Sequence, residues 1–214
     1  MLIIFDLDDT LIDTSGCVTP FKLEKVLEAM LGFQPEPEQL KALMQLNEEM
    51  SRSTDAVVAF GERLTISKES IDRGLAQLTL PLPEDFRVHC TPGAKEILEE
   101  FKSRCPIALV TVGQTAFQLD KLKKAGIEAS IFSKISISEI SVKKPFYKNL
   151  AEEFSVAPAD VWVCGDRIPI DLMPAHELQF KTVHMRWGRG KKMALEPWVD
   201  YSISGLTELR NIIR

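Results

Sequence analysis

The apolar residues of this chain fall into short continuous runs and into longer stretches with helical spacing. The first run, residues 2–5, leads directly into the acids Asp6, Asp8 and Asp9. A short apolar run of this kind predicts a strand that is buried on both faces, as strands of a parallel sheet are. Similar runs predict strands at residues 107–111, 131–132 with their neighbours, 161–164 and 182–185.

Helical patterns separate these predicted strands. They cover residues 94–102, 115–125 and 146–154, and Gly126 provides a stop signal after the second of them. Strands that alternate with helices predict an α/β fold, a doubly wound parallel sheet with helices on both faces. Ligands of such sheets bind at the carboxyl ends of the strands, which is where the acids after residue 5 are expected to lie.

The stretch between the first and second predicted strands contains no further strand pattern. It shows helical periodicity at residues 21–31, 37–50, 56–64 and 68–78, with Leu40, Leu43 and Leu46 on one face. The proline-rich segment 81–85 is expected to lead out of this block. We therefore expect an α/β core domain formed by residues 1–15 and 88–214, with an inserted helical domain at residues 16–87.

Composition and charge narrow the possible functions. The chain has 214 residues, 45% of them hydrophobic and 27% charged, as in an ordinary globular protein. Its 26 basic and 31 acidic residues give a net charge of -5, which argues against a nucleic-acid binder that uses a general basic surface. The four cysteines lack CxxC spacing, so they suggest neither a zinc cluster nor a disulfide framework. No apolar run is long enough to span a membrane, and none is typical of a signal peptide. We expect a cytoplasmic protein without a membrane partner.

The acids after the first strand predict a site with a cation. Asp6 and Asp8 stand two apart, so in an extended segment their side chains point to the same side while Leu7 packs behind them. Two such carboxylates do not both stay ionised without a cation that offsets their repulsion.

Four segments together resemble the motifs of the haloacid dehalogenase superfamily. They are DLDDTLIDT at 6–14, VTVG at 110–113, KKP at 143–145 and GDRIPID at 165–171, in the family's order and at or near predicted strand ends. The resemblance covers the whole chain, because the helical insertion lies where that family has its C1 cap. It implies a Rossmann-like core with an inserted helical cap.

The first motif suits phosphoryl transfer through a covalent intermediate. Asp6, the first acid after the strand, is the candidate nucleophile that would form an aspartyl-phosphate. Asp8 is the candidate general acid and base, which protonates the leaving oxygen and then deprotonates the attacking water. Mg²⁺ is the expected cofactor, since it removes the repulsion between phosphate and carboxylates.

The resemblance also implies the remaining site residues. The implied metal ligands are the Asp6 carboxylate, the main-chain carbonyl of Asp8, and Asp166. Asp171 is expected at the same metal site, where it supports the catalytic lysine or a metal-bound water.

The substrate phosphate and the catalytic lysine complete the predicted site. The Thr111 hydroxyl and the neighbouring main chain at Val112 and Gly113 are expected to hold phosphoryl oxygens. A lysine should orient the nucleophile, and both Lys143 and Lys144 are candidates.

Two further basic features of the sequence are Arg167, whose role the sequence leaves open, and the segment 187–192, which we do not assign to the site. Arg167 can contact substrate or pair with the neighbouring acids. The glycine-rich basic segment 187–192 lacks the spacing of a phosphate-binding loop, so we expect a solvated loop there.

The function expected from the sequence is a Mg²⁺-dependent phosphatase that acts on a small phosphorylated metabolite. A phosphomutase of the β-phosphoglucomutase type is the nearest alternative, and a non-catalytic phosphate-binding regulatory module is the alternative from another class. A dehalogenase is less compatible, because it needs neither the second acid Asp8 nor a magnesium site. The sequence makes no prediction of oligomeric state.

Overall fold

The protein consists of two compact units. The computed structural model describes residues 1–213. One unit, here called the core unit, comprises residues 1–15 together with the chain from Leu82 onward, and the other, the helical unit, comprises Gly16–Pro81. The expected boundary at residue 88 is therefore wrong, since the chain re-enters the core unit at Leu82. Its N–H donates a hydrogen bond to the Asp120 carboxylate at 3.2 Å, which fixes the entering segment there.

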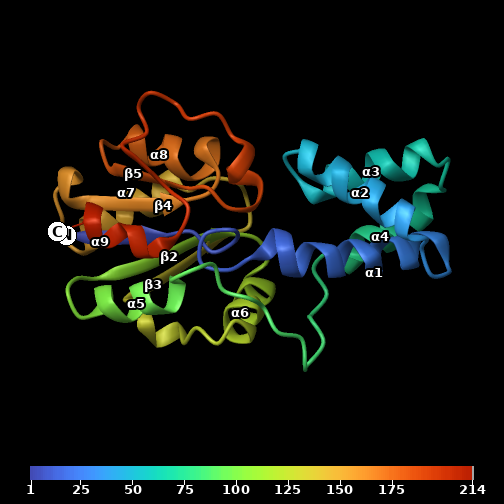
Figure 1. The fold of residues 1–214 in the computed structure, drawn as a ribbon, viewed down its shortest axis with the longest axis horizontal. Helices are drawn as coiled ribbons and strands as arrows, with labels where there is room; N and C mark the ends of the chain where they lie inside the picture. The colour runs from blue at the N-terminus through green and yellow to red at the C-terminus, as the bar shows by residue number, and fades with distance from the viewer. Residues whose placement is uncertain (214) are drawn as a thin grey trace. The chain divides into compact units, whose positions relative to one another are not determined.

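The core unit is built on a fully parallel sheet (Figure 1). The strand order is β3-β2-β1-β4-β5-β6, so the first strand of the chain lies in the interior. Ile3 of that strand pairs with Ile107 on one side and Trp162 on the other. The strands are β1 (Leu2–Phe5), β2 (Ile107–Val112), β3 (Lys134–Ser138), β4 (Val161–Gly165), β5 (Lys181–Met185) and β6 (Tyr201–Ile203).

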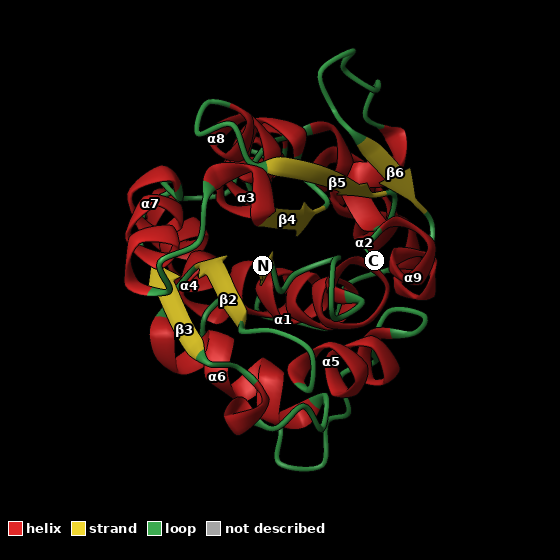
Figure 2. Cartoon of the chain, turned by 90° about the vertical axis from the view of Figure 1, so that its left-hand side faces the viewer, coloured by secondary structure: helices red, strands yellow, loops and turns green. Residues whose placement is uncertain are grey.

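Helices cover both faces of the sheet, as the alternation of strand and helix patterns predicts. α5 (Ala94–Lys102) and α6 (Thr115–Lys124) lie on one face, while α7 (Lys144–Glu153) and α8 (Met173–His176) lie on the other (Figures 1 and 2). A last short helix, α9 (Leu209–Ile212), follows the sixth strand. Shorter turns are the 3-10 segments Ala129–Ile131, Pro158–Asp160, Gly188–Lys192 and Leu206–Glu208 and the π-helical segments Thr14–Val18 and Ile168–Leu172.

The side chains of β1 point alternately to the two faces of the sheet, and they contribute to the apolar core on each face. Leu2 and Ile4 pack in one cluster with Tyr147 and Leu150 of α7. Successive side chains of a strand point to opposite faces, so Ile3 and Phe5 face the α5 side, and both are fully buried. The strand is thus apolar on both faces, and polar chemistry begins only where it ends.

The helical unit contains four helices around its own core. They are α1 (Thr19–Leu31), α2 (Pro37–Glu49), α3 (Ser53–Arg63) and α4 (Lys68–Gln77). α1 and α4 approach closely at Gly74, where an added Cβ would lie 2.4 Å from Cγ of Met30 and 3.2 Å from the carbonyl oxygen of Val26. The buried members of this core are Leu23, Val26, Leu27, Met30, Leu43, Leu46, Ala56, Val57, Phe60 and Ile71.

Two strands of the sheet differ from the sequence expectation. The strand expected at 131–132 is wrong, because residues 129–131 form a 3-10 turn and β3 starts only at Lys134. β3 is an edge strand whose polar residues alternate with isoleucines, so it shows no apolar run. β6 was not predicted, since it is a three-residue edge strand that starts with the exposed Tyr201.

No helix among the described residues combines the length and the apolar character that a membrane crossing needs.

The burial of α5 leads to a stability prediction. Leu98 of α5 is fully buried, whereas Leu119 of α6 is 40% exposed. Leu98→Ala should lower the free energy of unfolding by about 2–5 kcal/mol, because it leaves a cavity, and Leu119→Ala should change it by about 0.5 kcal/mol or less. Urea unfolding followed by tryptophan fluorescence tests this, since Trp162, Trp187 and Trp198 all belong to the core unit. Equal losses for the two variants would contradict the assigned core.

Candidate active site

The candidate site lies where the strand order of the sheet reverses. The chain proceeds from β1 to β2 and β3 on one side, then crosses to β4 and β5 on the other. The carboxyl ends at such a switch point form a crevice in open α/β sheets. Asp6 directly follows β1, Thr111 lies near the end of β2, and Asp166 directly follows β4. The fold therefore brings these three predicted residues to the same edge of the sheet.

Lys143 joins two of the acids at this edge. Its Nζ lies 2.5 Å from Oδ1 of Asp6 and 2.6 Å from Oδ1 of Asp171. The side chain of Lys143 is only 1% exposed. Burial alone would lower the pKa of this lysine, but the carboxylates of Asp171 and Asp6 outweigh it and raise the pKa well above its ordinary value. Lys143 is thus a fixed cation between two carboxylates.

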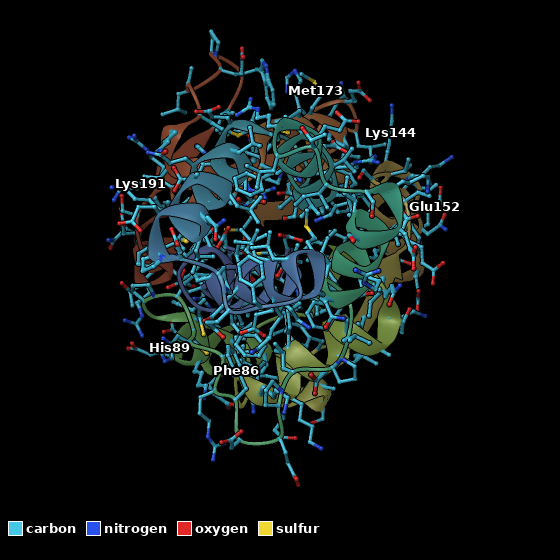
Figure 3. All side chains as sticks on the ribbon, turned by 90° about the vertical axis from the view of Figure 1, so that its right-hand side faces the viewer. Phe86, His89, Lys144, Glu152, Met173 and Lys191 are labelled. Carbon is cyan, nitrogen blue, oxygen red and sulfur yellow. The ribbon has the colours of Figure 1, made fainter. Side chains whose placement is uncertain are left out.

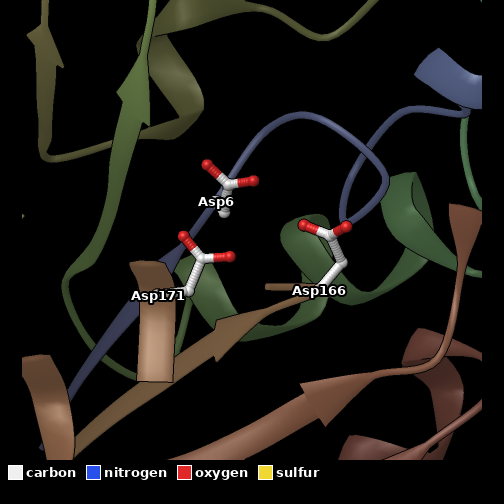
Figure 4. A group of neighbouring side chains, drawn as sticks. All are labelled: Asp6, Asp166 and Asp171. Carbon is white, nitrogen blue, oxygen red and sulfur yellow. The ribbon is translucent and has the colours of Figure 1, made fainter. Parts of the chain in front are cut away.

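Three carboxylates converge beside this lysine. Asp6, Asp166 and Asp171 each offer one oxygen, and these oxygens lie within 4.8 Å of one another (Figure 4). Burial, together with the neighbouring charges of Asp171 and Asp8, raises the pKa of Asp6 to about 7 even though Lys143 opposes the shift. Burial and the charges of Asp171 and Asp6 also raise the pKa of Asp166 well above its ordinary value. Ionisation of all three carboxylates would place more negative charge here than Lys143 balances.

The donor set of the cluster fits a divalent cation such as Mg²⁺. All three ligand candidates are carboxylates, the hard oxygen donors that this ion prefers. Burial and the neighbouring carboxylates raise the pKa values of Asp6 and Asp166, and a cation bound between them would favour their ionised forms.

Asp171 reaches the cluster because of local backbone geometry. It lies in the π-helical segment Ile168–Leu172, and its Oδ2 accepts a hydrogen bond from the N–H of Arg167 at 2.9 Å. Its side chain lies directly on Gly165, where an added Cβ would be 2.4 Å from Cβ of Asp171. Gly165 is therefore required as a glycine because Asp171 occupies the space of a side chain there.

Asp8 has a different set of partners. Its Oδ1 accepts hydrogen bonds from Nζ of Lys121 and from Oγ1 of Thr14, the latter at 2.5 Å. Its Oδ2 accepts from Nε2 of Gln118 at 2.9 Å. Burial would raise the pKa of Asp8, but Lys121 and the other donors outweigh burial and lower it. The Asp8 side chain does not belong to the carboxylate cluster, so only its main-chain carbonyl is left for the expected metal contact.

Asp6 and Asp8 stand two residues apart but have different partners. The chain turns directly after β1, since the N–H groups of Thr10 and Leu11 donate to the carbonyl of Leu7 at 3.3 and 3.0 Å. Each of the two carboxylates contacts its own lysine, Lys143 for Asp6 and Lys121 for Asp8.

The predicted phosphate-binding segment is organised by a glutamine. Thr111 is buried, and Nε2 of Gln118 lies 2.6 Å from its Oγ1 and 2.8 Å from the carbonyl oxygen of Val112. The N–H of Gly113 donates to the carbonyl of Ser138 at 2.8 Å, because the pairing of β2 with β3 continues for one more residue. The N–H of Gly113 is therefore not the free phosphate donor that the sequence suggested, and the hydroxyl of Thr111 is the better candidate.

Comparison with known proteins places this geometry in a family. The family model for haloacid dehalogenase-like hydrolases matches residues 3–185. The chain belongs to this family. The resemblance seen in the four sequence motifs is thereby confirmed.

Relatives of this hydrolase align along its full length. It is 26% identical to glyceraldehyde 3-phosphate phosphatase of Methanocaldococcus jannaschii, an alignment that covers 99% of this chain and 96% of the relative. It is 24% identical to N-acylneuraminate-9-phosphatase of Rattus norvegicus, covering 99% and 93% respectively. Its fold matches that of YfnB of Bacillus subtilis, solved bound to magnesium, with a TM-score of 0.77, 16% identity and coverage of 100% and 98%. The predicted α/β fold class is confirmed.

Of the two candidate lysines of this hydrolase, only Lys143 lies in the site. Lys144 is the first residue of α7 and lies at the periphery (Figure 3). Its Nζ pairs with Glu177 at 2.7 Å, and its side chain is 47% exposed. One position along the chain decides whether the lysine points into the site or toward solvent.

The structure adds residues that sequence reasoning missed. Gln118 and Lys121 of α6 are described above, and both are buried polar side chains three positions apart on one helix face. His184 of β5 is also buried, and its Nε2 lies 3.0 Å from the carbonyl oxygen of Asp166, which holds the end of β4 in place. Polar residues in register with the buried face of a predicted helix or strand are the signal that could have found them.

The segment 187–192 is only in part the solvated loop that we expected, since Lys191 and Lys192 are exposed but Gly190 is buried. Added Cβ atoms would lie 2.1 Å from Oδ2 of Asp9 at Gly188 and 2.4 Å from the carbonyl oxygen of Asp166 at Gly190. Nε1 of Trp187 also donates to Oδ1 of Asp13 at 2.9 Å. The segment packs against the acidic edge of the sheet because its glycines allow close backbone contact.

The two adjacent lysines provide a matched test of the site geometry. Lys143→Met should lower the free energy of unfolding by about 3–5 kcal/mol, because it leaves buried carboxylates without their cation. Lys144→Met removes only an exposed ion pair and should cost about 1 kcal/mol or less. Urea unfolding in the presence of EDTA measures both, with the chelator excluding compensation by a bound cation. Similar costs for both variants would contradict the position of Lys143.

Proposed function

We propose that this protein is a Mg²⁺-dependent phosphatase that hydrolyses a small phosphate monoester through an aspartyl-phosphate on Asp6. The observation that carries the proposal is the buried group of Asp6, Lys143, Asp166 and Asp171 at the switch point of the sheet. The expected enzyme class, a phosphoric monoester hydrolase, is supported by the relatives from Methanocaldococcus jannaschii and Rattus norvegicus, both phosphatases.

Asp6 is the proposed nucleophile. Lys143 contacts its Oδ1, which leaves Oδ2 for attack on phosphorus. As the bond from Oδ2 to phosphorus forms, the bond from phosphorus to the substrate's ester oxygen breaks. Lys143 keeps the carboxylate in one orientation and balances charge that gathers on the phosphoryl group, to which Thr111 donates its hydroxyl proton in a hydrogen bond.

Asp8 is the proposed general acid and base. In its protonated form, Asp8 gives its proton to the leaving ester oxygen in the first step. In the second step, water attacks phosphorus and gives a proton to the Asp8 carboxylate, while the bond between phosphorus and Asp6 breaks. Inorganic phosphate leaves, and both aspartates return to their starting state.

The proposed ligands of Mg²⁺ are Asp6, the main-chain carbonyl of Asp8, and Asp166. When bound, Mg²⁺ would neutralise charge on the phosphate and on the carboxylates. Asp171 contacts Lys143 and is proposed to position it.

The helical unit is proposed to act as a C1 cap that excludes bulk water from the bound substrate. This proposal is supported by its place in the chain, directly after the segment that holds Asp6 and Asp8. The proposed location is the cytoplasm, since all four cysteines are free thiols.

Phosphate release with and without metal is the main test. We expect purified protein to release inorganic phosphate from at least one member of a panel that includes glyceraldehyde 3-phosphate and N-acylneuraminate 9-phosphate. EDTA should abolish the release, and added Mg²⁺ should restore it. Activity that EDTA leaves unchanged would contradict the metal assignment. Isomerisation of a sugar phosphate without net phosphate release would favour the phosphomutase.

A substitution at the nucleophile tests the covalent step. Asp6→Asn should lower kcat by at least about 10³-fold, because an amide oxygen is a poor nucleophile for phosphorus. Asp160→Asn changes an exposed aspartate that precedes β4, outside the site, and should leave kcat unchanged. Both are measured by phosphate release under saturating Mg²⁺. Full activity in Asp6→Asn would rule out the mechanism.

A further inference from the structure

Two polar side chains of α6 are buried at the active-site edge, apart from the carboxylate cluster. Gln118 is 2% exposed and Lys121 is 3% exposed. They are three positions apart, so they lie on the same face of the helix. Buried lysine and glutamine side chains are uncommon unless they are paired, because burial removes their water.

Both side chains are directed at Asp8. Lys121 donates to Oδ1 of Asp8, and Gln118 donates to Oδ2 at 2.9 Å. Each carboxylate oxygen therefore has its own donor from the same helix, and rotation of the carboxylate would break one bond or the other. Thr14 adds a third donor at Oδ1.

Gln118 also links Asp8 to the predicted phosphate-binding residue. Its Nε2 lies 2.6 Å from Oγ1 of Thr111 and 2.8 Å from the carbonyl oxygen of Val112. A hydroxyl that accepts a hydrogen bond keeps its own proton for another acceptor. When the Gln118 amide donates one of its two hydrogens to Oγ1, the Thr111 proton points away from Gln118 and is left for a phosphoryl oxygen.

Gly113 provides the space for this glutamine. Its φ is +145°, and an added Cβ would lie 3.1 Å from Cδ and 3.3 Å from Cγ of Gln118. The glycine of the VTVG segment is thus explained by the side chain that packs over it.

We propose that Gln118 and Lys121 are positioning residues that hold the Asp8 carboxyl group toward the ester oxygen of the substrate. The inference rests on the proposed phosphatase function and adds two residues to it. Lys121 keeps its protons throughout. The proton that reaches the leaving oxygen comes from the protonated form of Asp8, and Lys121 stays in contact with the carboxylate that this transfer leaves behind.

Substrates with different leaving groups separate this role from a purely structural one. An alkyl phosphate such as glycerol 3-phosphate has a poor leaving group that needs the proton of a general acid. The leaving group of 4-nitrophenyl phosphate departs as a stable anion and needs it little. The ratio kcat/KM reports the steps up to cleavage of the ester bond, so it isolates the first proton transfer.

Lys121→Met should lower the pH-independent kcat/KM for glycerol 3-phosphate by about 10²-fold, because the Asp8 carboxyl group is no longer held, and that for 4-nitrophenyl phosphate by less than about fivefold. The pH-independent value is compared because the loss of Lys121 also removes a charge that lowers the pKa of Asp8. Lys121→Arg, which restores a cationic donor, should recover part of the loss on the alkyl substrate. Lys123→Met changes an exposed lysine of the same helix and should alter neither value. Equal losses on both substrates would overturn the inference. Lys121→Gln carries the same comparison if Lys121→Met does not fold.

A double-mutant comparison tests whether Lys121 acts through Asp8. In an Asp8→Asn background, Lys121→Met should cause no further loss of kcat/KM on the alkyl substrate, because the group that it positions is already removed. A full additional loss would overturn the inference. These outcomes differ from failure of the proposed function, in which the unaltered protein itself would release no phosphate.

Discussion

The structure depends on how one edge of a buried parallel sheet accommodates four carboxylates. Asp6, Asp166 and Asp171 converge within 4.8 Å of one another, and Asp8 follows only two residues after Asp6. Two buried lysines balance part of this charge. Lys143 comes from the start of α7 on one face of the sheet, and Lys121 comes from α6 on the other. The helices on both faces therefore do more than cover the sheet, since each contributes one cation to its polar edge.

This arrangement gives two neighbouring acids different surroundings. Asp6 shares its space with two other carboxylates, and burial raises its pKa to about 7. The pKa of Asp8 is lowered instead, because the donors from α6 and Thr14 outweigh its burial. Two titratable groups whose surroundings shift their pKa values in opposite directions are suited to different chemical roles. The difference follows from the lysine that each carboxylate contacts, Lys143 for Asp6 and Lys121 for Asp8.

The sequence predicts the centre of the sheet well and its edges poorly. β1 and β4 are apolar on both faces, so their residues form continuous runs, and the acids that follow them were placed correctly at the strand ends. β3 and β6 are edge strands with polar or exposed residues, and their patterns carry little information.

The same reasoning explains which site residues were predicted. Lys143 could not be separated from Lys144, because the choice depends on where α7 begins and on the direction of each side chain. Gln118 and Lys121 were missed because an amphipathic pattern assigns polar residues to the solvent face. Only the position of Asp8 beside α6 shows why this helix has polar residues on its buried face.

Buried ion pairs add little stability compared with apolar packing. The apolar cluster between the sheet and α7 is continuous without the acids or lysines, so the polar edge is a local cost that the fold tolerates. A cost of this kind is expected at a site that is maintained for chemistry.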